Sequence, residues 1–166
     1  MGSPNLANVI SGEMDVIARE CAEILEGKTT LADVTGYTLE MLEEIYERAY
    51  NDWNAGDTER ATAGFAFLLL QQPLDRRFHF AFGCALKHQG EFRKALTYFG
   101  YATVMQANDP YSCFHIAECL QALNEIDAAR DALDACIALC YGQIDNNQHY
   151  DSLRQRAENL LTKLNK

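Results

Sequence analysis

The sequence predicts an all-α protein built from three helical hairpins that stack in a right-handed solenoid, with one further helix at each end. The main evidence is an internal repeat, because Phe65, Phe99 and Leu133 stand 34 residues apart in succession. Small residues keep the same interval: Ala49, Gly56 and Ala61, then Gly83, Gly90 and Ala95, then Ala117, Asn124 and Ala129. A period of 34 residues is that of the tetratricopeptide repeat, in which each unit is two helices joined by a tight turn.

Local turn signals agree with this period. Gly56 and Gly90 fall between the two helices of a hairpin, where a residue with left-handed backbone ends the first helix. Asn124 is the usual substitute for glycine at such a position. Asp109-Pro110 fits the start of the third repeat, as an N-cap followed by proline at the first helical position.

The chain divides into four segments of one domain. Residues 1–10 are expected to be disordered or expression-derived, and residues 11–36 to hold an N-terminal helix, capped by Ser11, and its turn-rich connection. Residues 37–142 hold the three repeats, with Thr38 as the first N-cap, and residues 146–166 a C-terminal capping helix. With 166 residues, 48% of them hydrophobic, the chain is long enough to bury a sizeable core.

Charge and hydropathy exclude several kinds of partner. The formal net charge of −10 opposes binding to nucleic acid or to an anionic membrane. No apolar run approaches the roughly 20 residues that span a bilayer, and no signal peptide is recognisable. We therefore expect a cytoplasmic protein that neither binds nucleic acid nor inserts into a membrane.

The six cysteines include no CxxC pair, so we expect free thiols, a reducing compartment and neither a metal nor a cofactor. His115 with Cys119, and Cys136 with Cys140, are each one helical turn apart and form the alternative, a set of soft metal ligands. The missing zinc signature argues against that alternative.

The first helix of each repeat should line the concave face of the stack, and its inward positions can be counted from the small residues at 49, 83 and 117. The predicted groove residues are Tyr46, Tyr50 and Trp53 in the first repeat, Arg77, Phe80, Cys84 and Lys87 in the second, and Tyr111, Phe114, Glu118 and Gln121 in the third. Aromatic residues gather at one end, as in a groove that grips an extended peptide. Packing inside the core is the alternative for each of them.

Both terminal helices carry an apolar stripe. The N-terminal stripe consists of Met14, Ile17, Cys21, Ile24 and Leu25, and must be buried against either the first repeat or a second copy of the chain. We favour the homodimer. The C-terminal stripe consists of Tyr150, Leu153, Ala157, Leu160, Leu161 and Leu164, and is expected to cap the solenoid.

Four stretches make the chain resemble a known family: TLADVTG at residues 30–36, IYERAYNDWNAG at 45–56, FHFAFGCALKHQGEFRKA at 78–95 and FHIAECL at 114–120. They are similar to the class II chaperones of bacterial type III secretion, which hold the pore-forming translocator proteins. The resemblance implies a cytoplasmic, non-enzymatic chaperone that keeps translocators soluble and separate before export. It also implies a short extended cargo motif in the groove, at Tyr46, Tyr50 and Trp53, continued by Phe80 and Phe114, and dimerisation through the N-terminal region. Trp53 departs from the more usual tyrosine.

Two other function classes compete with this interpretation. An enzyme is disfavoured, because the four histidines are scattered and no nucleophile, metalloprotease or phosphate-loop motif is present. We therefore expect no catalytic residues. The stronger alternative is another tetratricopeptide adaptor, which would bind the carboxyl terminus of a partner through a basic clamp formed by Arg77 and Lys87.

Overall fold

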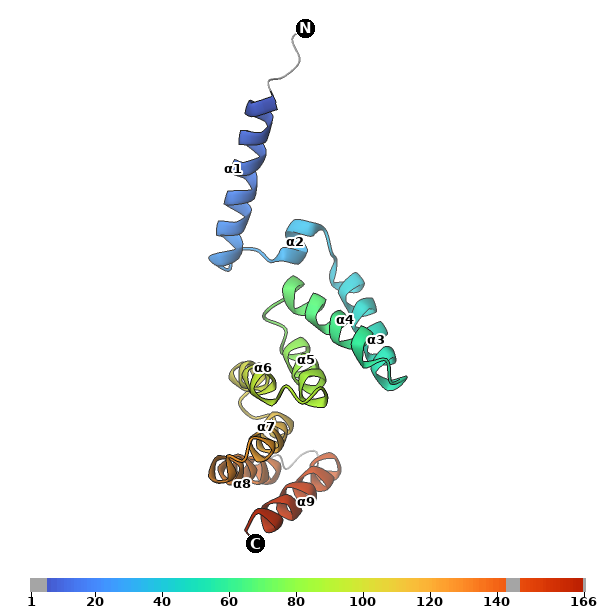
Figure 1. Cartoon of the computed structure of the whole chain (residues 1–166), viewed down its shortest axis with the longest axis vertical. Helices are drawn as coiled ribbons and strands as arrows, with labels where there is room; N and C mark the ends of the chain where they lie inside the picture. The colour runs from blue at the N-terminus through green and yellow to red at the C-terminus, as the bar shows by residue number, and fades with distance from the viewer. Residues whose placement is uncertain (1–5, 143–146, 166) are drawn as a thin grey trace.

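The computed structural model describes residues 6–142 and 147–165, and this part of the chain folds into helices with short connections (Figure 1). The helices are α1 (Leu6–Leu25), α2 (Leu31–Thr35), α3 (Leu39–Asn54), α4 (Thr58–Gln71), α5 (Arg76–His88), α6 (Phe92–Met105), α7 (Pro110–Ala122), α8 (Ile126–Gly142) and α9 (Asn147–Leu164). No strand occurs in the described residues. Within them, every helix is too short or too polar to cross a membrane.

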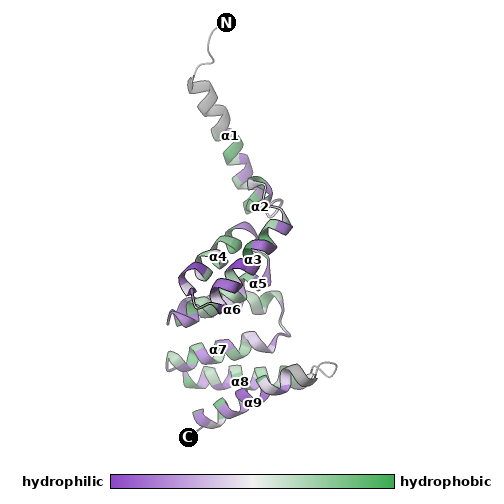
Figure 2. Cartoon of the chain, turned by 90° about the vertical axis from the view of Figure 1, so that its right-hand side faces the viewer, coloured by the Kyte–Doolittle hydropathy of each residue, from purple (hydrophilic) through white to green (hydrophobic). Residues whose placement is uncertain are grey.

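Three helical hairpins, α3–α4, α5–α6 and α7–α8, pack one after another along the solenoid (Figures 1 and 2). Residues of the 34-residue register lie at the centre of the stack: Phe65 is 2% exposed, and Phe99 and Leu133 are fully buried. The predicted all-α fold of three stacked hairpins is therefore confirmed.

The turn signals act as the sequence indicates. Gly56, Gly90 and Asn124 have φ of 86°, 78° and 62°, so each takes the left-handed conformation that ends the first helix of its hairpin. The Asp109 carboxylate accepts a hydrogen bond from the Tyr111 amide at 3.2 Å, with Pro110 at the first turn of α7. The turn inside each hairpin and the start of α7 are thus determined by the residues that form them.

Close helix packing explains the small residues. A Cβ added to Gly83 would lie 2.9 Å from the ring of Phe99, so α5 and α6 can approach each other only if residue 83 has no side chain. Ala49, Ala95 and Ala117 stand at other small-residue positions of the repeat, and each is at most 2% exposed. The small residues of the repeat therefore mark positions where two helices pack closely against each other.

The N-terminal region differs from the prediction in two respects. Helix α1 begins at Leu6, so Ser11 lies inside the helix and does not cap it. The connection over residues 31–36 contains the short helix α2, started by a capping box in which Thr30 and Asp33 exchange hydrogen bonds, and ended by Gly36. The Thr-x-x-Asp pattern was the sequence signal for this extra helix. Residues 1–5 lie outside the described part.

Helix α1 projects from one end of the stack and makes no extensive contact with the other described helices (Figure 1). Met14, Ile17 and Leu25 of its predicted stripe are 60%, 52% and 88% exposed. Cys21 is also exposed, and Ile24 is half-buried. The first repeat therefore does not cover this stripe, and its burial against a second copy of the chain stays a prediction.

At the other end, α9 packs along α8. Leu153 and Ala157 are buried in a cluster that contains Leu133, Cys136 and Cys140, while the rest of the predicted C-terminal stripe packs around it, namely Tyr150, Leu160, Leu161 and Leu164. This contact covers the apolar face of the last repeat, as a solenoid requires at its end.

Candidate peptide-binding groove

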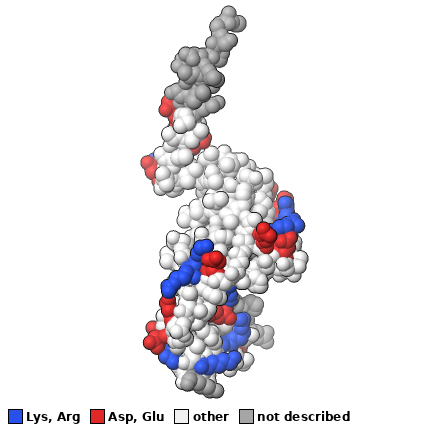
Figure 3. Space-filling model, viewed as in Figure 1, with Lys and Arg blue, Asp and Glu red and all other residues white. Residues whose placement is uncertain are grey.

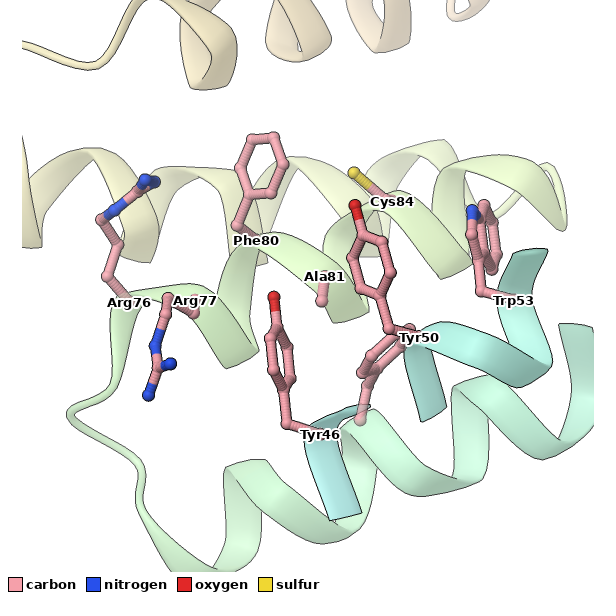
Figure 4. A pocket seen from close by; sticks show the side chains of 9 residues that line it. Tyr46, Tyr50, Trp53, Arg76, Arg77, Phe80, Ala81 and Cys84 are labelled. Atoms are coloured by element: carbon pink, nitrogen blue, oxygen red, sulfur yellow. The ribbon is translucent and has the colours of Figure 1, made fainter. Parts of the chain in front are cut away.

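A cavity of about 230 Å³ opens between α3 and α5 on the concave side of the first two repeats (Figure 4). Its lining consists of Tyr46, Tyr50, Trp53, Phe65, Arg76, Arg77, Phe80, Ala81 and Cys84. Six of these were predicted from the repeat register: Tyr46, Tyr50, Trp53, Arg77, Phe80 and Cys84. The structure therefore brings together all three predicted groove residues of the first repeat and three of the four predicted for the second repeat.

Helical spacing places the aromatic side chains of α3 on one wall. Tyr46, Tyr50 and Trp53 follow each other at four and three residues, so they share the face that points toward Phe80 and Cys84 of α5 (Figure 4). Phe80 is held in turn by Phe99, at 5.7 Å between ring centroids. The wall is thus formed by side chains that core contacts already orient.

The three aromatic residues of α3 are partly buried and partly free. Tyr46 contacts the core ring of Phe78 at 5.6 Å and the ring of Tyr50 at 5.9 Å. Burial raises the pKa of the Tyr46 hydroxyl, and the neighbouring Tyr50 adds to the effect. Tyr50 remains 49% exposed. Rings fixed on one side and open on the other lose little rotamer freedom when a ligand packs on them.

The charged end of the cavity is already neutralised. The Arg77 guanidinium lies 2.6 Å from the Glu43 carboxylate and 2.7 Å from that of Asp75, and its pKa is raised by these two partners, with Asp75 the stronger. The Arg76 guanidinium lies 2.9 Å from the carboxylate of Asp109, which is buried. Neither arginine is therefore a free clamp for a carboxylate.

Lys87 lies outside the cavity, between the second and third repeats. Its ammonium group forms an ion pair with Glu118 and lies 2.8 Å from His115 Nδ1, which is 3.2 Å from Glu118 Oε2. Burial alone would raise the pKa of the Glu118 carboxyl, but hydrogen bonds with His115 and Lys87 outweigh burial and lower the pKa to about 2. These three residues form a closed polar cluster.

The remaining predicted groove residues do not reach the cavity. Phe114 is 3% exposed, because α9 covers it and places the Arg156 guanidinium 4.5 Å from the centre of its ring. Phe114 therefore does not line the cavity, and a contact between Phe114 and cargo stays a prediction. Tyr111 is half-buried, 6.0 Å from Tyr150 of α9, and Gln121 is exposed near the end of α7. The capping helix thus contacts two of the four predicted groove residues of the third repeat, Tyr111 and Phe114.

Three lining residues were missed from the sequence. Phe65 enters the sequence analysis only as a member of the 34-residue register; it is buried, and it also lines the cavity. Arg76 and Ala81 each directly neighbour a predicted residue of α5, so a count restricted to one narrow face of the helix left them out. A wider stripe, as helices that face a core usually have, would have included them.

The buried thiols have no polar role in this groove. Burial raises the pKa of Cys84 to about 12 and that of Cys119 to about 11, so both are protonated at neutral pH. Cys136 and Cys140 lie in the core beneath α9. Among residues 6–142 and 147–165, no group of three or more histidine, cysteine or acidic side chains is placed to hold a metal ion.

Acidic and basic side chains alternate on the face drawn in Figure 3, at the turn between α3 and α4 and over the later repeats.

A second hollow, of about 470 Å³, adjoins the cavity on the outer side of α3 and is lined by Tyr46, Glu47, Tyr50 and Asn51. The two hollows share Tyr46 and Tyr50 in their linings, so they lie next to each other along α3.

No protein-family model matches the chain. The low calcium response locus protein H of Yersinia pestis is 29% identical over 109 residues, which are 66% of this chain and 65% of that protein. The crystallised translocator chaperone SycD of Yersinia enterocolitica is 28% identical, with a TM-score of 0.71 over 81% of this chain and 97% of that one. PcrH in complex with the chaperone-binding region of PopD is 26% identical, with a TM-score of 0.72 over 77% and 93% of the two chains.

The fold and the groove define a tetratricopeptide-repeat protein with an aromatic, peptide-sized cavity on its concave side. The comparisons confirm the more specific resemblance that the sequence motifs predicted. This chain is similar in sequence and in fold to the translocator chaperones of bacterial type III secretion.

Proposed function

We propose that this protein is a non-enzymatic chaperone that binds secreted translocator proteins in the bacterial cytoplasm and keeps them soluble and separate before export. The observation that carries this proposal is the cavity between α3 and α5, whose aromatic wall coincides with the groove predicted from the repeat register. Similar structures support it, because SycD has been solved with a peptide of the translocator YopD, and PcrH with the chaperone-binding regions of PopD and PopB.

The cavity indicates what kind of segment it receives. Its wall is mainly aromatic, and its two arginines are paired with carboxylates, so an uncharged side chain fits it better than an acidic one. Aromatic anchors in such pockets commonly contribute most of the binding energy of an interface. The proposed ligand is therefore a short, extended, largely apolar segment of the cargo, inserted among Tyr46, Tyr50, Trp53 and Phe80.

The competing function is that of an adaptor that binds the carboxyl terminus of a partner. It would need unpaired cations, but Arg77 is held by Glu43 and Asp75, and Lys87 is held by Glu118. Opening either pair to admit a carboxylate would leave protein carboxylates without their partners. These ion pairs favour an internal segment of the cargo over its terminus.

We further propose that α1 joins two copies of the chain. A helix with Met14, Ile17 and Leu25 more than half exposed leaves an apolar stripe in water, and a second copy offers an equivalent stripe. A dimer form of SycD is among the similar structures. Dimerisation through α1 leaves the concave groove open.

Peptides from the chaperone-binding regions of YopD, PopD and PopB test the proposed function directly. Each peptide is titrated into the protein twice, once with a free and once with an amidated carboxyl terminus. Equal binding of the two forms is expected if the groove takes an internal segment. Loss of binding on amidation would support the adaptor instead, and no binding of any of the three peptides would contradict the chaperone proposal.

A further inference from the structure

The hollow beside the cargo cavity differs from it in chemistry. The cavity between α3 and α5 is closed at its charged end by arginines that have their own carboxylate partners. The hollow on the outer side of α3 has no basic residue in its lining, which consists of two tyrosines, a carboxylate and a carboxamide. It therefore offers a negatively charged binding surface beside a cavity whose charges are paired.

Glu47 is the distinctive group of this hollow. The other acidic residues near the groove, Glu43, Asp75 and Asp109, are each paired with an arginine. Glu47 is exposed, and no basic side chain of residues 6–142 or 147–165 pairs with it. An unpaired carboxylate at the rim of a binding groove attracts a cation and repels an acidic ligand.

The two tyrosines reinforce this preference. Faces of aromatic rings attract cations, and the structure contains one such contact nearby, with the Arg77 guanidinium 5.4 Å from the centre of the Tyr46 ring. Tyr50 is 49% exposed and lies one helical turn from Glu47, so its ring and that carboxylate border the same hollow. A ring face beside a carboxylate suits the ammonium or guanidinium group of a long side chain.

We propose that the hollow lined by Tyr46, Glu47, Tyr50 and Asn51 receives a lysine or arginine side chain of the bound segment. Because the hollow shares Tyr46 and Tyr50 with the cavity, the basic residue flanks the apolar residue that enters the cavity. The inference rests on the proposed function and specifies the cargo further, as an apolar segment with a basic residue on one side.

A random peptide library tests this proposal without a known cargo. Dodecapeptides displayed on phage are selected on the immobilised wild-type protein, on the Glu47→Gln variant and on an Asp131→Asn variant. Asp131 is an exposed acidic residue of α8, remote from the groove, so its substitution removes one negative charge without touching the hollow. The two variants thus have the same net charge.

The wild-type and Asp131→Asn proteins should enrich apolar residues together with a lysine or arginine at one fixed offset. The Glu47→Gln protein should enrich the same apolar residues without that basic position. For the most enriched peptide, replacing the basic residue by norleucine should weaken binding to the wild type about fivefold and leave binding to Glu47→Gln unchanged.

The outcomes separate the two proposals. Enrichment of apolar residues with no basic position, or an unchanged basic preference in Glu47→Gln, would overturn the inference about the hollow and leave the proposed function standing. Selection of no apolar consensus at all would count against the proposed function itself.

Discussion

The ammonium group of Lys87 on α5 pairs with the carboxylate of Glu118 on α7, across the interface between the second and third repeats. The residues one period earlier are Trp53 and Cys84, and both line the open cavity between the first and second repeats. The same two positions therefore form an apolar cavity at one interface and an ion pair at the next. The cavity between α3 and α5 thus has no equivalent at these two positions of the next interface.

The Glu118 pair should make stability depend on pH. Because the pKa of folded Glu118 is lowered to about 2 from its ordinary 4.5, the pair stabilises the fold above about pH 4.5 and loses this effect as the pH falls toward 2. We expect Glu118→Gln to reduce the free energy of unfolding by about 2 kcal/mol at pH 7, with the difference shrinking in acid. Urea titrations at several pH values measure it. Exposed Glu44→Gln is the control, and an equal loss in both variants would refute the role of the pair.

The N-terminal stripe should control the oligomeric state. Replacing Ile17 and Ile24 together by aspartate places two charges on the stripe and should shift the sedimenting mass toward the monomer. Arg19→Glu, on the opposite face of α1, changes the net charge equally and should leave the dimer intact. A wild-type protein that is monomeric at micromolar concentration would contradict the dimer proposal.

Thiol reactivity should separate one cysteine from the other five. Cys21 is exposed on α1, whereas Cys119, Cys136 and Cys140 are buried, and burial raises the pKa of Cys84 and Cys113 as well. At pH 8 without reductant, Ellman's reagent should therefore modify one thiol rapidly in the folded Ile17→Asp/Ile24→Asp variant, in which no second copy covers Cys21, and all six after denaturation. A Cys21→Ser variant should lack the rapid phase. Fewer than six groups in the denatured protein would mean that a disulfide or a bound metal is present.

Two glycines offer a matched test of helix packing. Gly83→Ala would place a methyl group 2.9 Å from the Phe99 ring and should cost about 2 kcal/mol of stability. Gly100→Ala meets nothing within 4 Å and should be neutral or stabilising by up to about 1 kcal/mol, because alanine favours the helix. Thermal unfolding of both variants measures the contrast, and equal effects would contradict the packing argument.

The repeat could be predicted well because its signals are local and recur. Small residues at helix contacts and left-handed residues at turns are dictated within each hairpin, so Gly56, Gly90 and Asn124 each appear in the role that the sequence indicates. The same register located the first part of the groove, since Tyr46, Tyr50 and Trp53 share one face of α3. In a regular solenoid, the spacing of residues in the sequence determines where their side chains lie in the structure.

The sequence is less informative where a distant segment packs against the repeat. Register places Phe114 on the concave side, but α9 folds over the third repeat and buries it, a contact that no spacing within the repeat reveals. Likewise, Arg77 and Lys87 resemble a basic clamp until the structure brings Glu43 and Glu118 beside them. Pairing between distant segments decides whether a charged residue is available to a ligand.

The central claim is that cargo binds between α3 and α5, and the single tryptophan provides the most direct measurement. Trp53 emission is followed while the PopD chaperone-binding peptide is titrated into the wild type, Tyr50→Ala and Tyr101→Ala. Tyr101, on α6, matches Tyr50 in exposure, at 50% against 49%, and lies outside the cavity. We predict a shift of Trp53 emission on binding, affinity at least about tenfold weaker for Tyr50→Ala, unchanged affinity for Tyr101→Ala, and similar melting temperatures. Saturation without any change in Trp53 emission, together with equal affinities of the two variants, would contradict this account.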